Sequence, residues 1–530
     1  MRRNAFFAAL LAGLAACGGH EDARPLAPIP EAPQLLVVGW DGASFRAIDP
    51  LLAAGKLPHL AGLIARGARA PLRSTVVPIS SAAWTTATTG KGPGESGVFG
   101  FHEPVPNSYE LTLVSARSNR AAPLWRLLTG RGIPSLVFGV PLTYPPEPIL
   151  GTMVCGMLAP RDAAYTWPPE LAASLRARGF LPDLDPWLEE REPGWAETEA
   201  QLDLREEILG ELLALDDWRL AWVVFKELDV LSHFSYGLDF AAHVEPIYRR
   251  LDALLGRLLA LVGADTNVIV LSDHGFANYT HGLNLHAWLA AMGFATRRAQ
   301  AAREPLPAGP FARRFAEEAA QRLGELELAR TQAFAWVCEG NYGSVRLNLA
   351  GREPEGIVAE VQADVVLARI EAELRAHPWV SEVWRAEELL PGPERAALPD
   401  LLFETQPHVQ VFAERGSELE GAYQPLVADH DLWGIFVAAG PSFTRLAGPA
   451  PERELTLLDV APLALHLLGL PVPEEMEGAV PLALLAGERA VQRVSEASFG
   501  AAAALRPGQA YTEDEIETLE RGLRALGYGD

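Results

Sequence analysis

A short apolar run with a polar ending, Val268 to Gly275, constrains the fold of this 530-residue chain more than any other stretch. Its first four residues, Val-Ile-Val-Leu, are apolar and mostly β-branched, which is typical of a strand buried on both faces of a sheet. Asp273 and His274 follow where this strand ends. Because ligands of open α/β sheets bind beyond the carboxyl ends of the strands, we expect a metal site here.

Three other strand-like runs also carry acidic or histidine side chains at one end. The runs with their polar residues are 34–40 with Asp41, 221–228 with Asp229 and His233, and 434–439 with His430. Asp229 and His233 are four residues apart, so one helical turn places both on the same face. In the last run the polar residue precedes the strand. We interpret these regions as one site assembled from several strand ends.

The side chains at these ends suit a pair of metal ions. They are three carboxylates and three imidazoles: Asp41, Asp229, His233, Asp273, His274 and His430. This set matches two borderline cations such as Zn²⁺, each with three protein ligands and an open position, and Mn²⁺ or Mg²⁺ are the alternatives. Two cations about 3.5–4 Å apart stabilise the attacking and leaving oxygens of a phosphoryl displacement. A hydroxyl between them is deprotonated and becomes nucleophilic.

The segment 74–94 supplies a candidate for that hydroxyl. A short extended piece leads into Ser80 and Ser81, and a compact helical stretch closed by Gly90 follows. A Ser at a helix start is usually an N-cap. The same position also places a hydroxyl at the positive end of the helix dipole, next to free backbone N–H groups. On the residues alone, both interpretations stay open.

The pattern changes between the run at 268 and the run at 434. Residues 343–349 and 379–384 alternate like half-exposed antiparallel strands, and residues 356–377 between them have a helical pattern. We therefore expect an α/β fold with a mostly parallel central sheet flanked by helices, and a smaller α+β subdomain inserted at about 276–425.

The first 33 residues differ from the rest of the chain. Residues 1–4 are basic, residues 5–16 are apolar but too short to span a membrane, and Leu-Ala-Ala-Cys17 follows. These are the three parts of a secretory signal. The last part resembles the bacterial lipoprotein signal, in which Cys17 is lipidated, although an ordinary signal peptide is the alternative. Residues 18–33 are rich in proline and are typical of a tether.

These features predict the organisation and location of the protein. A signal peptide of residues 1–17 and the tether precede a catalytic domain at 34–480, and a helical tail at 481–530 packs on the body. We expect a protein of the bacterial cell envelope, lipid-anchored and facing the periplasm or the exterior. We expect the protein to contact the membrane through its N-terminal lipid anchor only.

The formal net charge of −24 excludes some partners. It argues against nucleic acid and against electrostatic attraction to anionic lipid. It also repels anionic substrates over most of the surface, so a phosphate site needs local positive charge such as metal ions. Cys155 and Cys338 either form one disulfide or remain two separate thiols. His281 and His286 are either near the site or in surface loops, and His466 is interpreted as a packed helix residue.

The chain resembles the alkaline phosphatase superfamily, specifically the type I phosphodiesterase/nucleotide pyrophosphatase branch and its bacterial phosphohydrolase and phosphomutase relatives. The resemblance spans roughly residues 34–528. It rests on five segments in order: Gly39-Trp-Asp-Gly42; Pro78-Ile-Ser with Trp84-Thr-Thr and Thr89-Gly-Lys-Gly-Pro93; Asp229-x-x-x-His233; Ser272-Asp-His-Gly275; and His430 before Gly434-Ile-Phe-Val-Ala-Ala-Gly-Pro441. It implies an alkaline-phosphatase-like fold.

The resemblance also implies residue roles. Asp229, His233 and His430 hold one metal, and Asp41, Asp273 and His274 hold the other. Aligning back from Thr89-Gly90 places the nucleophile at Ser80, with Ser81 as the runner-up, whereas Thr75 comes too early. The reaction passes through a covalent phospho-enzyme that a metal-bound water hydrolyses.

Two departures from related sequences bear on the reaction. Pro93-Gly-Glu-Ser-Gly97 has Ser96 where many relatives have His, and this position is not one of the six ligands. Ser80-Ser-Ala-Ala-Trp84 lacks the Pro and Arg of a sulfatase signature, which disfavours a sulfatase.

We therefore expect a metal-dependent phosphohydrolase acting on a small phosphate ester or a lipid headgroup. The alternatives are a phosphoryl transferase or mutase of the same superfamily, and a weakly catalytic surface protein that binds a glycan or a phospholipid headgroup.

Overall fold

A computed structural model describes residues 34–526 except for several gaps. The gaps are 184–194, 216, 299–322, 324–325, 396, 414–418, 445–452, 488–489, 502–503 and 507. The expected signal peptide and tether lie outside the described residues. Within the described part, no helix is long and apolar enough to cross a membrane.

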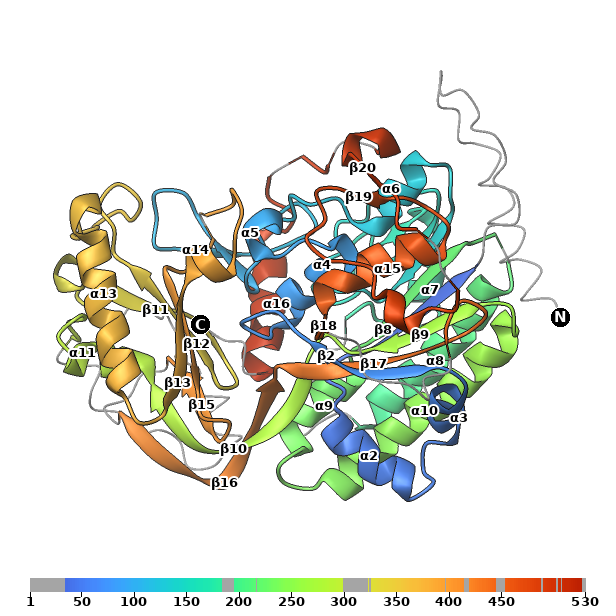
Figure 1. Cartoon of the computed structure of the whole chain (residues 1–530), viewed down its shortest axis with the longest axis horizontal. Coiled ribbons are helices and arrows are strands. Elements are labelled where there is room, and N and C mark those ends of the chain that lie inside the picture. The colour runs from blue at the N-terminus through green and yellow to red at the C-terminus, as the bar shows by residue number, and fades with distance from the viewer. Residues whose placement is uncertain are drawn as a thin grey trace.

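A nine-stranded sheet forms the centre of the larger lobe (Figure 1). Its order is β18 (Leu455–Thr456), β2 (Ala68–Arg73), β17 (Trp433–Ala439), β9 (Asn267–Leu271), β1 (Leu35–Trp40), β8 (Leu220–Phe225), β5 (Ser135–Phe138), β6 (Gly151–Val154) and β7 (Thr166–Trp167). Five of the eight neighbouring pairs are parallel. This confirms the predicted α/β class with a mostly parallel sheet.

Helices cover both faces of this sheet, which explains why every residue of β1, β8 and β9 is buried. On one face lie α2 (Phe45–Ala53), α3 (Pro58–Arg66), α8 (Trp195–Leu213) and α10 (Glu245–Val262), and on the other lie α4 (Ser80–Thr89), α6 (Leu124–Gly130) and α15 (Val460–Leu467) (Figure 1). The other helices of the lobe are α5 (Pro93–Ser96), α7 (Glu170–Ala177) and α9 (Glu227–Ser235).

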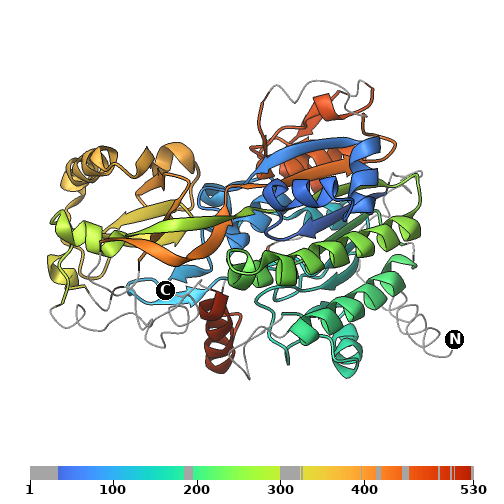
Figure 2. The ribbon, with the colours of Figure 1, turned by 90° about the horizontal axis from the view of Figure 1, so that it is seen from below.

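A long antiparallel ribbon leads from the central sheet to a second lobe (Figures 1 and 2). It consists of β10 (Gly275–Asn284) and β16 (Glu420–Asp431), which pair from Gly275–Asp431 at the central sheet to Leu283–Glu420 in the second lobe. The strand β15 (Val409–Phe412) adds to the far side of β10. The ribbon therefore continues directly from the strand end that carries Asp273 and His274.

The second lobe has its own sheet and its own hydrophobic core. The sheet order is β11 (Ala333–Glu339), β12 (Tyr342–Leu347), β14 (Leu401–Thr405) and β13 (Val380–Arg385). The helix α13 (Glu360–Ala376) packs on this sheet, and α11 (Leu285–Ala291) and α14 (Ala386–Leu389) belong to the same lobe. The alternating segments and the helical pattern expected here correspond to β12, β13 and α13.

Small elements complete the molecule. They are the hairpin of β3 (His102–Pro104) and β4 (Leu111–Leu113), the pair β19 (Val472–Pro473) and β20 (Arg493–Val494), and the C-terminal α16 (Glu513–Leu526). Tyr511 and Leu523 join a hydrophobic cluster that contains Ile79 and Val230. Both cysteines of the described chain, Cys155 and Cys338, are free thiols.

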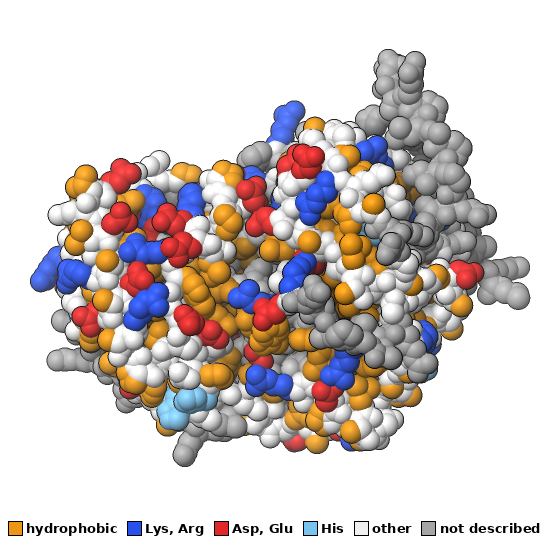
Figure 3. Space-filling model, viewed as in Figure 1, with side chains coloured by type: hydrophobic (Ala, Val, Ile, Leu, Met, Phe, Trp, Pro, Cys, Tyr) orange, Lys and Arg blue, Asp and Glu red, His pale blue; other side chains and the backbone are white. Residues whose placement is uncertain are grey.

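The surface in Figure 3 carries acidic and basic side chains next to one another. Hydrophobic side chains gather on this face where the two lobes meet. The polar candidates for the site are buried.

Candidate metal centre and nucleophile

The sheet topology explains how distant segments meet at one place. Asp41 follows β1 directly, and Asp273 and His274 lie between β9 and β10, so parallel strands deliver them to the same edge. Asp229 and His233 lie one turn apart in α9, which starts just after β8. His430 precedes β17, which runs antiparallel to β9, so its beginning lies where the parallel strands end. All six side chains are buried.

The first group consists of Asp229, His233 and His430. The Nε2 atom of His430 lies 3.2 Å from Asp229 Oδ1 and 3.1 Å from His233 Nε2. The Nδ1 atom of His430 lies 2.7 Å from the carbonyl oxygen of Pro78, so Nδ1 donates a proton there. The Nε2 lone pair of His430 therefore faces the Nε2 atom of His233 and the carboxylate of Asp229. A cation or a proton shared by these atoms stabilises such an arrangement.

The second group surrounds His274. Its Nε2 atom lies 3.4 Å from Asp273 Oδ2 and 3.5 Å from Asp41 Oδ1. Asp229 is also close, since its carboxylate, that of Asp41 and the His274 ring can place one ligand atom each within 4.8 Å of one another. Asp229 therefore lies between the two groups, a position that the sequence pattern did not indicate.

Three carboxylate oxygens of the second group lack a hydrogen-bond donor among the described residues. They are Asp41 Oδ1 and both oxygens of Asp273, and all are buried. Burial raises the pKa of both carboxyl groups, and the negative charge of Asp229 raises the pKa of Asp41 further. Buried anionic oxygens without donors are costly unless a cation compensates them. The residues present therefore fit a pair of divalent cations.

Ser80 is the first residue of α4, and its hydroxyl points into the second group. Its Oγ atom lies 3.1 Å from His274 Nε2. His274 Nδ1 lies 3.1 Å from the Gly275 carbonyl oxygen and donates to it, which directs the Nε2 lone pair toward Ser80. Burial and the nearby His430 lower the pKa of His274, so its ring stays neutral.

The hydroxyls of Ser81 and Thr75 are not hydrogen-bonded to the residues of the two groups. Ser81 Oγ is buried and has no hydrogen-bond partner among the described residues. Thr75 Oγ1 donates to the carbonyl oxygen of Val77 at 2.9 Å. Ile79 is the N-cap of α4 and no side chain caps this helix, so Ser80 does not have the capping role that its position also permits.

Four residues around the site carried no assignment from the sequence. The indole N–H of Trp84 donates to Asp41 Oδ2 at 2.8 Å. Glu339 Oε1, from β11 of the second lobe, lies 3.6 Å from His430 Nδ1, and Asp429 Oδ1 accepts from the backbone N–H of His430 at 2.9 Å. Lys226 is buried next to α9, and burial lowers its pKa to about 8.

Three further histidines, His281, His286 and His466, belong to neither group. His281 contacts Trp379 in the second lobe, with ring centroids 5.4 Å apart. His286 is buried in α11, and His466 is buried in α15, as interpreted for a packed helix residue.

Several solved structures have a fold similar to that of this chain. The human ectonucleotide pyrophosphatase/phosphodiesterase 5 is 14% identical, with a TM-score of 0.54, over 86% of this chain and 100% of that chain. An inactive murine form in complex with AMP gives 15% identity, a TM-score of 0.54 and the same coverage. Phosphonoacetate hydrolase from Sinorhizobium meliloti 1021, in complex with phosphonoformate, gives 16% identity and a TM-score of 0.56, over 83% of this chain and 96% of that chain. These similarities confirm the alkaline-phosphatase-like fold.

A search of curated proteins finds no match. A sequence profile described as type I phosphodiesterase / nucleotide pyrophosphatase matches residues 35–431, which is most of the chain and includes both candidate metal groups. The chain therefore belongs to the type I phosphodiesterase/nucleotide pyrophosphatase family of the alkaline phosphatase superfamily, a family of phosphoric ester hydrolases.

Proposed function

We propose that this protein is a metal-dependent phosphohydrolase of the phosphodiesterase or nucleotide pyrophosphatase type, with Ser80 as the nucleophile. The position of the Ser80 hydroxyl carries the proposal. It lies 3.1 Å from His274 Nε2, inside the buried carboxylate and imidazole groups, and it does not cap its helix. A serine with only a structural role would be expected to cap its helix, and it would not require an imidazole nitrogen beside its hydroxyl.

The six buried side chains would hold two divalent cations. In this proposal Asp229, His233 and His430 form one ligand set, and Asp41, Asp273 and His274 form the other. In support, the first three side chains lie together, Asp41 and His274 lie together with Asp229, and Asp273 Oδ2 lies 3.4 Å from His274 Nε2. Zn²⁺ is the favoured ion because the sets mix imidazole and carboxylate, and Mn²⁺ or Mg²⁺ are alternatives. Bound cations supply positive charge that favours an ionised hydroxyl and offsets the charge of a phosphate.

The reaction follows from the place of Ser80. Its oxygen forms a bond to phosphorus while the bond from phosphorus to the leaving alcohol oxygen breaks. The proton that Ser80 loses and the proton that the alcohol gains exchange with solvent. Water then attacks the phosphoserine, which restores Ser80 and releases the second product. Backbone N–H groups in the first turn of α4 favour the anionic group.

The protein also orients its own ligands. The carbonyl oxygens of Gly275 and Pro78 fix the rings of His274 and His430 through their Nδ1 atoms. The indole of Trp84 fixes Asp41. Partners of this kind hold metal ligands in one geometry and raise metal affinity.

Hydrolysis of two chromogenic esters tests the proposal. The protein without residues 1–17 is treated with a chelator, and Zn²⁺, Mn²⁺ or Mg²⁺ is added back before bis-p-nitrophenyl phosphate or p-nitrophenyl phosphate is supplied. We expect metal-restored hydrolysis, and the diester-to-monoester ratio then identifies the type of ester. Absence of cleavage of both esters by protein with two bound metals per chain would contradict the proposal.

The substrate is proposed to be a small phosphate ester or a lipid headgroup. Support comes from the ligands in the complexes of two structural relatives, AMP in one and phosphonoformate in the other, which are both small phosphorus-containing anions.

A further inference from the structure

The turn between β11 and β12 of the second lobe lies directly against His430. It consists of Gly340 and Asn341, and Glu339 is the last residue of β11. Glu339 is buried, and its Oε1 atom lies 3.6 Å from Nδ1 of His430. The Nε2 atom of the same ring faces the other two members of the first group. One imidazole therefore joins the second lobe to the candidate metal centre.

The backbone of His430 is held from both sides. The backbone N–H of Gly340 donates to Asp429 Oδ2 at 3.3 Å, and Asp429 Oδ1 accepts from the backbone N–H of His430 at 2.9 Å. The carbonyl oxygen of His430 accepts from Tyr279 Oη at 2.5 Å. The turn therefore acts on the peptide group before His430, and the ribbon acts on the peptide group after it.

The close approach of this turn requires a glycine at its first position. Gly340 has a φ of 54°, in the left-handed region that other residues rarely adopt. A Cβ atom at Gly340 would overlap the carbonyl oxygen of His430 and would lie 2.8 Å from Tyr279 Oη. The missing side chain is what allows the turn to touch the backbone of His430.

The turn is itself fixed within the second lobe. The carbonyl oxygen of Gly340 accepts from the backbone N–H of Val411 at 2.8 Å, and that of Asn341 accepts from the backbone N–H of Thr405 at 2.8 Å. Val411 belongs to the hydrophobic core of the second lobe. A side chain positioned by this turn is therefore positioned by the second core.

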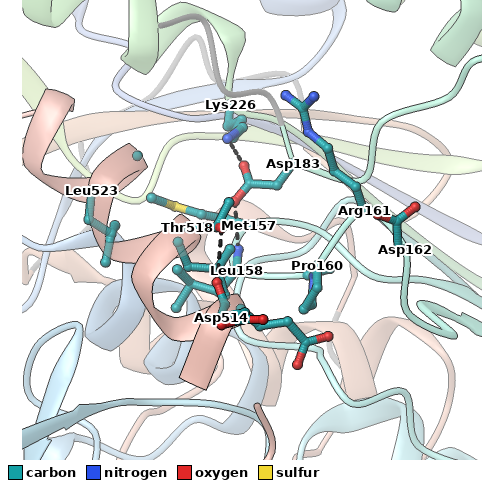
Figure 4. A pocket seen from close by; sticks show the side chains of 14 residues that line it. Met157, Leu158, Pro160, Arg161, Asp162, Asp183, Lys226, Asp514, Thr518 and Leu523 are labelled. Carbon is teal, nitrogen blue, oxygen red and sulfur yellow. Dashed lines mark hydrogen bonds and ion pairs between the residues drawn. The ribbon is translucent and has the colours of Figure 1, made fainter. Parts of the chain in front are cut away.

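A second contact holds β11 against the larger lobe. Val337, two residues before Glu339, packs against the hydrophobic cluster that contains Ile79, the N-cap of α4. Other members of this cluster line a cavity of about 280 Å³ beside α16, namely Met157, Leu158 and Leu523 (Figure 4). None of the six candidate metal ligands lines this cavity, so we do not include it in the candidate site.

A carboxylate behind a metal-binding imidazole strengthens the bond that the other ring nitrogen makes to the metal. It fixes the orientation of the ring and raises its basicity. The carbonyl oxygen of Pro78 already accepts from His430 Nδ1 at 2.7 Å, but it carries no net charge. Glu339 adds a negative charge at 3.6 Å, in a buried place where salt and solvent screen it little.

We propose, resting on the proposed function, that Glu339 and Gly340 are positioning residues for His430. The charge of Glu339 strengthens, through the His430 ring, the binding of the ion held by the first group. Gly340 allows the turn to fix the His430 backbone. The second lobe thereby sets the affinity of the candidate site for one of its two ions.

Metal binding without substrate tests the role of Glu339. Competition with a chromogenic chelator measures the affinity of the metal-free protein for each Zn²⁺ ion. We expect Glu339→Gln to weaken the binding of one ion by about 10–100-fold and to leave the other unchanged, since the ring loses the nearby charge but keeps its hydrogen bond to Pro78. Unchanged affinity for both ions would overturn the role of Glu339.

Two further variants identify the affected ion. Asp273→Asn is expected to remove the ion of the second group, and His233→Ala that of the first. In the Asp273→Asn protein, the addition of Glu339→Gln should still weaken the remaining ion by about 10–100-fold. In the His233→Ala protein, the same addition should have no effect. A loss of affinity only in the His233→Ala protein would connect Glu339 to the other ion and would overturn the proposal.

Glu353→Gln is the matched control for Glu339→Gln. Glu353 is also buried in the second lobe, but its partners are Arg346 and Arg352. We expect Glu353→Gln to lower the melting temperature and to leave both Zn²⁺ affinities unchanged. An equal loss of affinity in the two variants would show that any weakening of the second lobe has this effect, which would contradict a specific role of Glu339.

Gly340→Ala tests the backbone contact separately. The added methyl group must displace His430, so we expect the first-group ion to bind at least about tenfold more weakly. Gly351→Ala is the control, because Gly351 also has a positive φ, of 88°, but an added Cβ atom there meets no atom within 4 Å. Both variants should lower the melting temperature, and only Gly340→Ala should lower the Zn²⁺ affinity. Equal Zn²⁺ affinities of the two variants would overturn the role of Gly340, and Glu339→Gln gives the decision if Gly340→Ala does not fold.

The same titrations separate this inference from the proposed function. Weaker Zn²⁺ binding by Glu339→Gln supports the inference even if neither chromogenic ester is cleaved, which would contradict only the proposed hydrolysis. Ester cleavage by a Glu339→Gln protein with wild-type Zn²⁺ affinities would overturn the inference alone. Glu339, Asp429 and His430 can also place one ligand atom each within 4.8 Å of one another. A third bound ion that is lost in Glu339→Gln would make Glu339 a ligand, and it would overturn the positioning role.

Discussion

At the scale of single residues, the two adjacent serines of α4 make the sharpest comparison. Ser80 Oγ lies 3.1 Å from His274 Nε2, whereas Ser81 Oγ has no hydrogen-bond partner among the described residues. We expect Ser80→Ala to lower kcat by at least about a thousandfold because the covalent step is lost. Metal content, measured by emission spectrometry, should stay near that of the wild type. Near-full activity of Ser80→Ala with an inactive Ser81→Ala would place the nucleophile one residue later.

Asp273 tests the metal ligands without touching the nucleophile. Both of its carboxylate oxygens are buried and have no donor among the described residues, so a cation is their expected partner. Asp273→Asn keeps the shape but removes the negative charge, and we expect less bound metal and lower activity together. Metal content is measured after dialysis against a weak chelator. An unchanged stoichiometry would exclude Asp273 as a ligand.

At the scale of elements, the packing of α4 on β1 joins the sheet to the site. A Cβ atom at Gly39 would lie 2.4 Å from Cη2 of Trp84, the residue whose indole holds Asp41. We expect Gly39→Ala to lower the free energy of unfolding by about 1–3 kcal/mol through overpacking, as measured by urea denaturation. Gly62→Ala, in α3, is the control, because its added methyl group meets only Arg66 Nη1 at 3.8 Å. Equal free energies of unfolding of the two variants would show that α4 moves to accommodate the added methyl group without a loss of stability.

The sequence predicts elements and strand ends better than it predicts contacts between them. The apolar runs of β1, β8 and β9 identify a buried sheet, and the polar residues after them identify the edge where the candidate site lies. His430 breaks the pattern by preceding its strand, and the antiparallel direction of β17 explains this exception. In contrast, Glu339 comes from β11 of the second lobe without a periodic signal, and only tertiary packing brings it to His430.

At the scale of the whole molecule, we propose that a lipid anchor at Cys17 holds the protein at a membrane. Cys17 follows the apolar stretch of residues 5–16, in the position of a lipidated cysteine. We expect the full-length protein expressed in a bacterium to sediment with the membrane fraction, and Cys17→Ala to reduce this fraction strongly. An immunoblot of the membrane and soluble fractions measures this distribution for the wild type and for Cys17→Ala. A membrane fraction unchanged by Cys17→Ala would contradict lipidation at this cysteine.

The ribbon of β10 and β16 connects the metal centre to the second lobe. Asp273 and His274 precede β10, His430 lies on β16, and Phe276 pairs with His430 across the ribbon. The second lobe also reaches back to the site, since Glu339 of β11 approaches His430. Within the ribbon, the His430 carbonyl oxygen accepts from Tyr279 Oη at 2.5 Å. One end of the ribbon therefore carries candidate ligands of both proposed ions, and the other end belongs to the second core.

Metal removal should act on this ribbon first. A cation that binds only the folded protein stabilises it, and the local gain is largest where the ligands are attached. We expect chelation to lower the melting temperature and to increase amide hydrogen exchange most in residues 273–279 and 428–431. Exchange in β12 and β14, which belong to the core of the second lobe, should change less. Because the ribbon also positions the second lobe, a uniform change over both lobes would indicate that the two cores unfold as one unit. No change in the ribbon would show that its residues do not hold the ions.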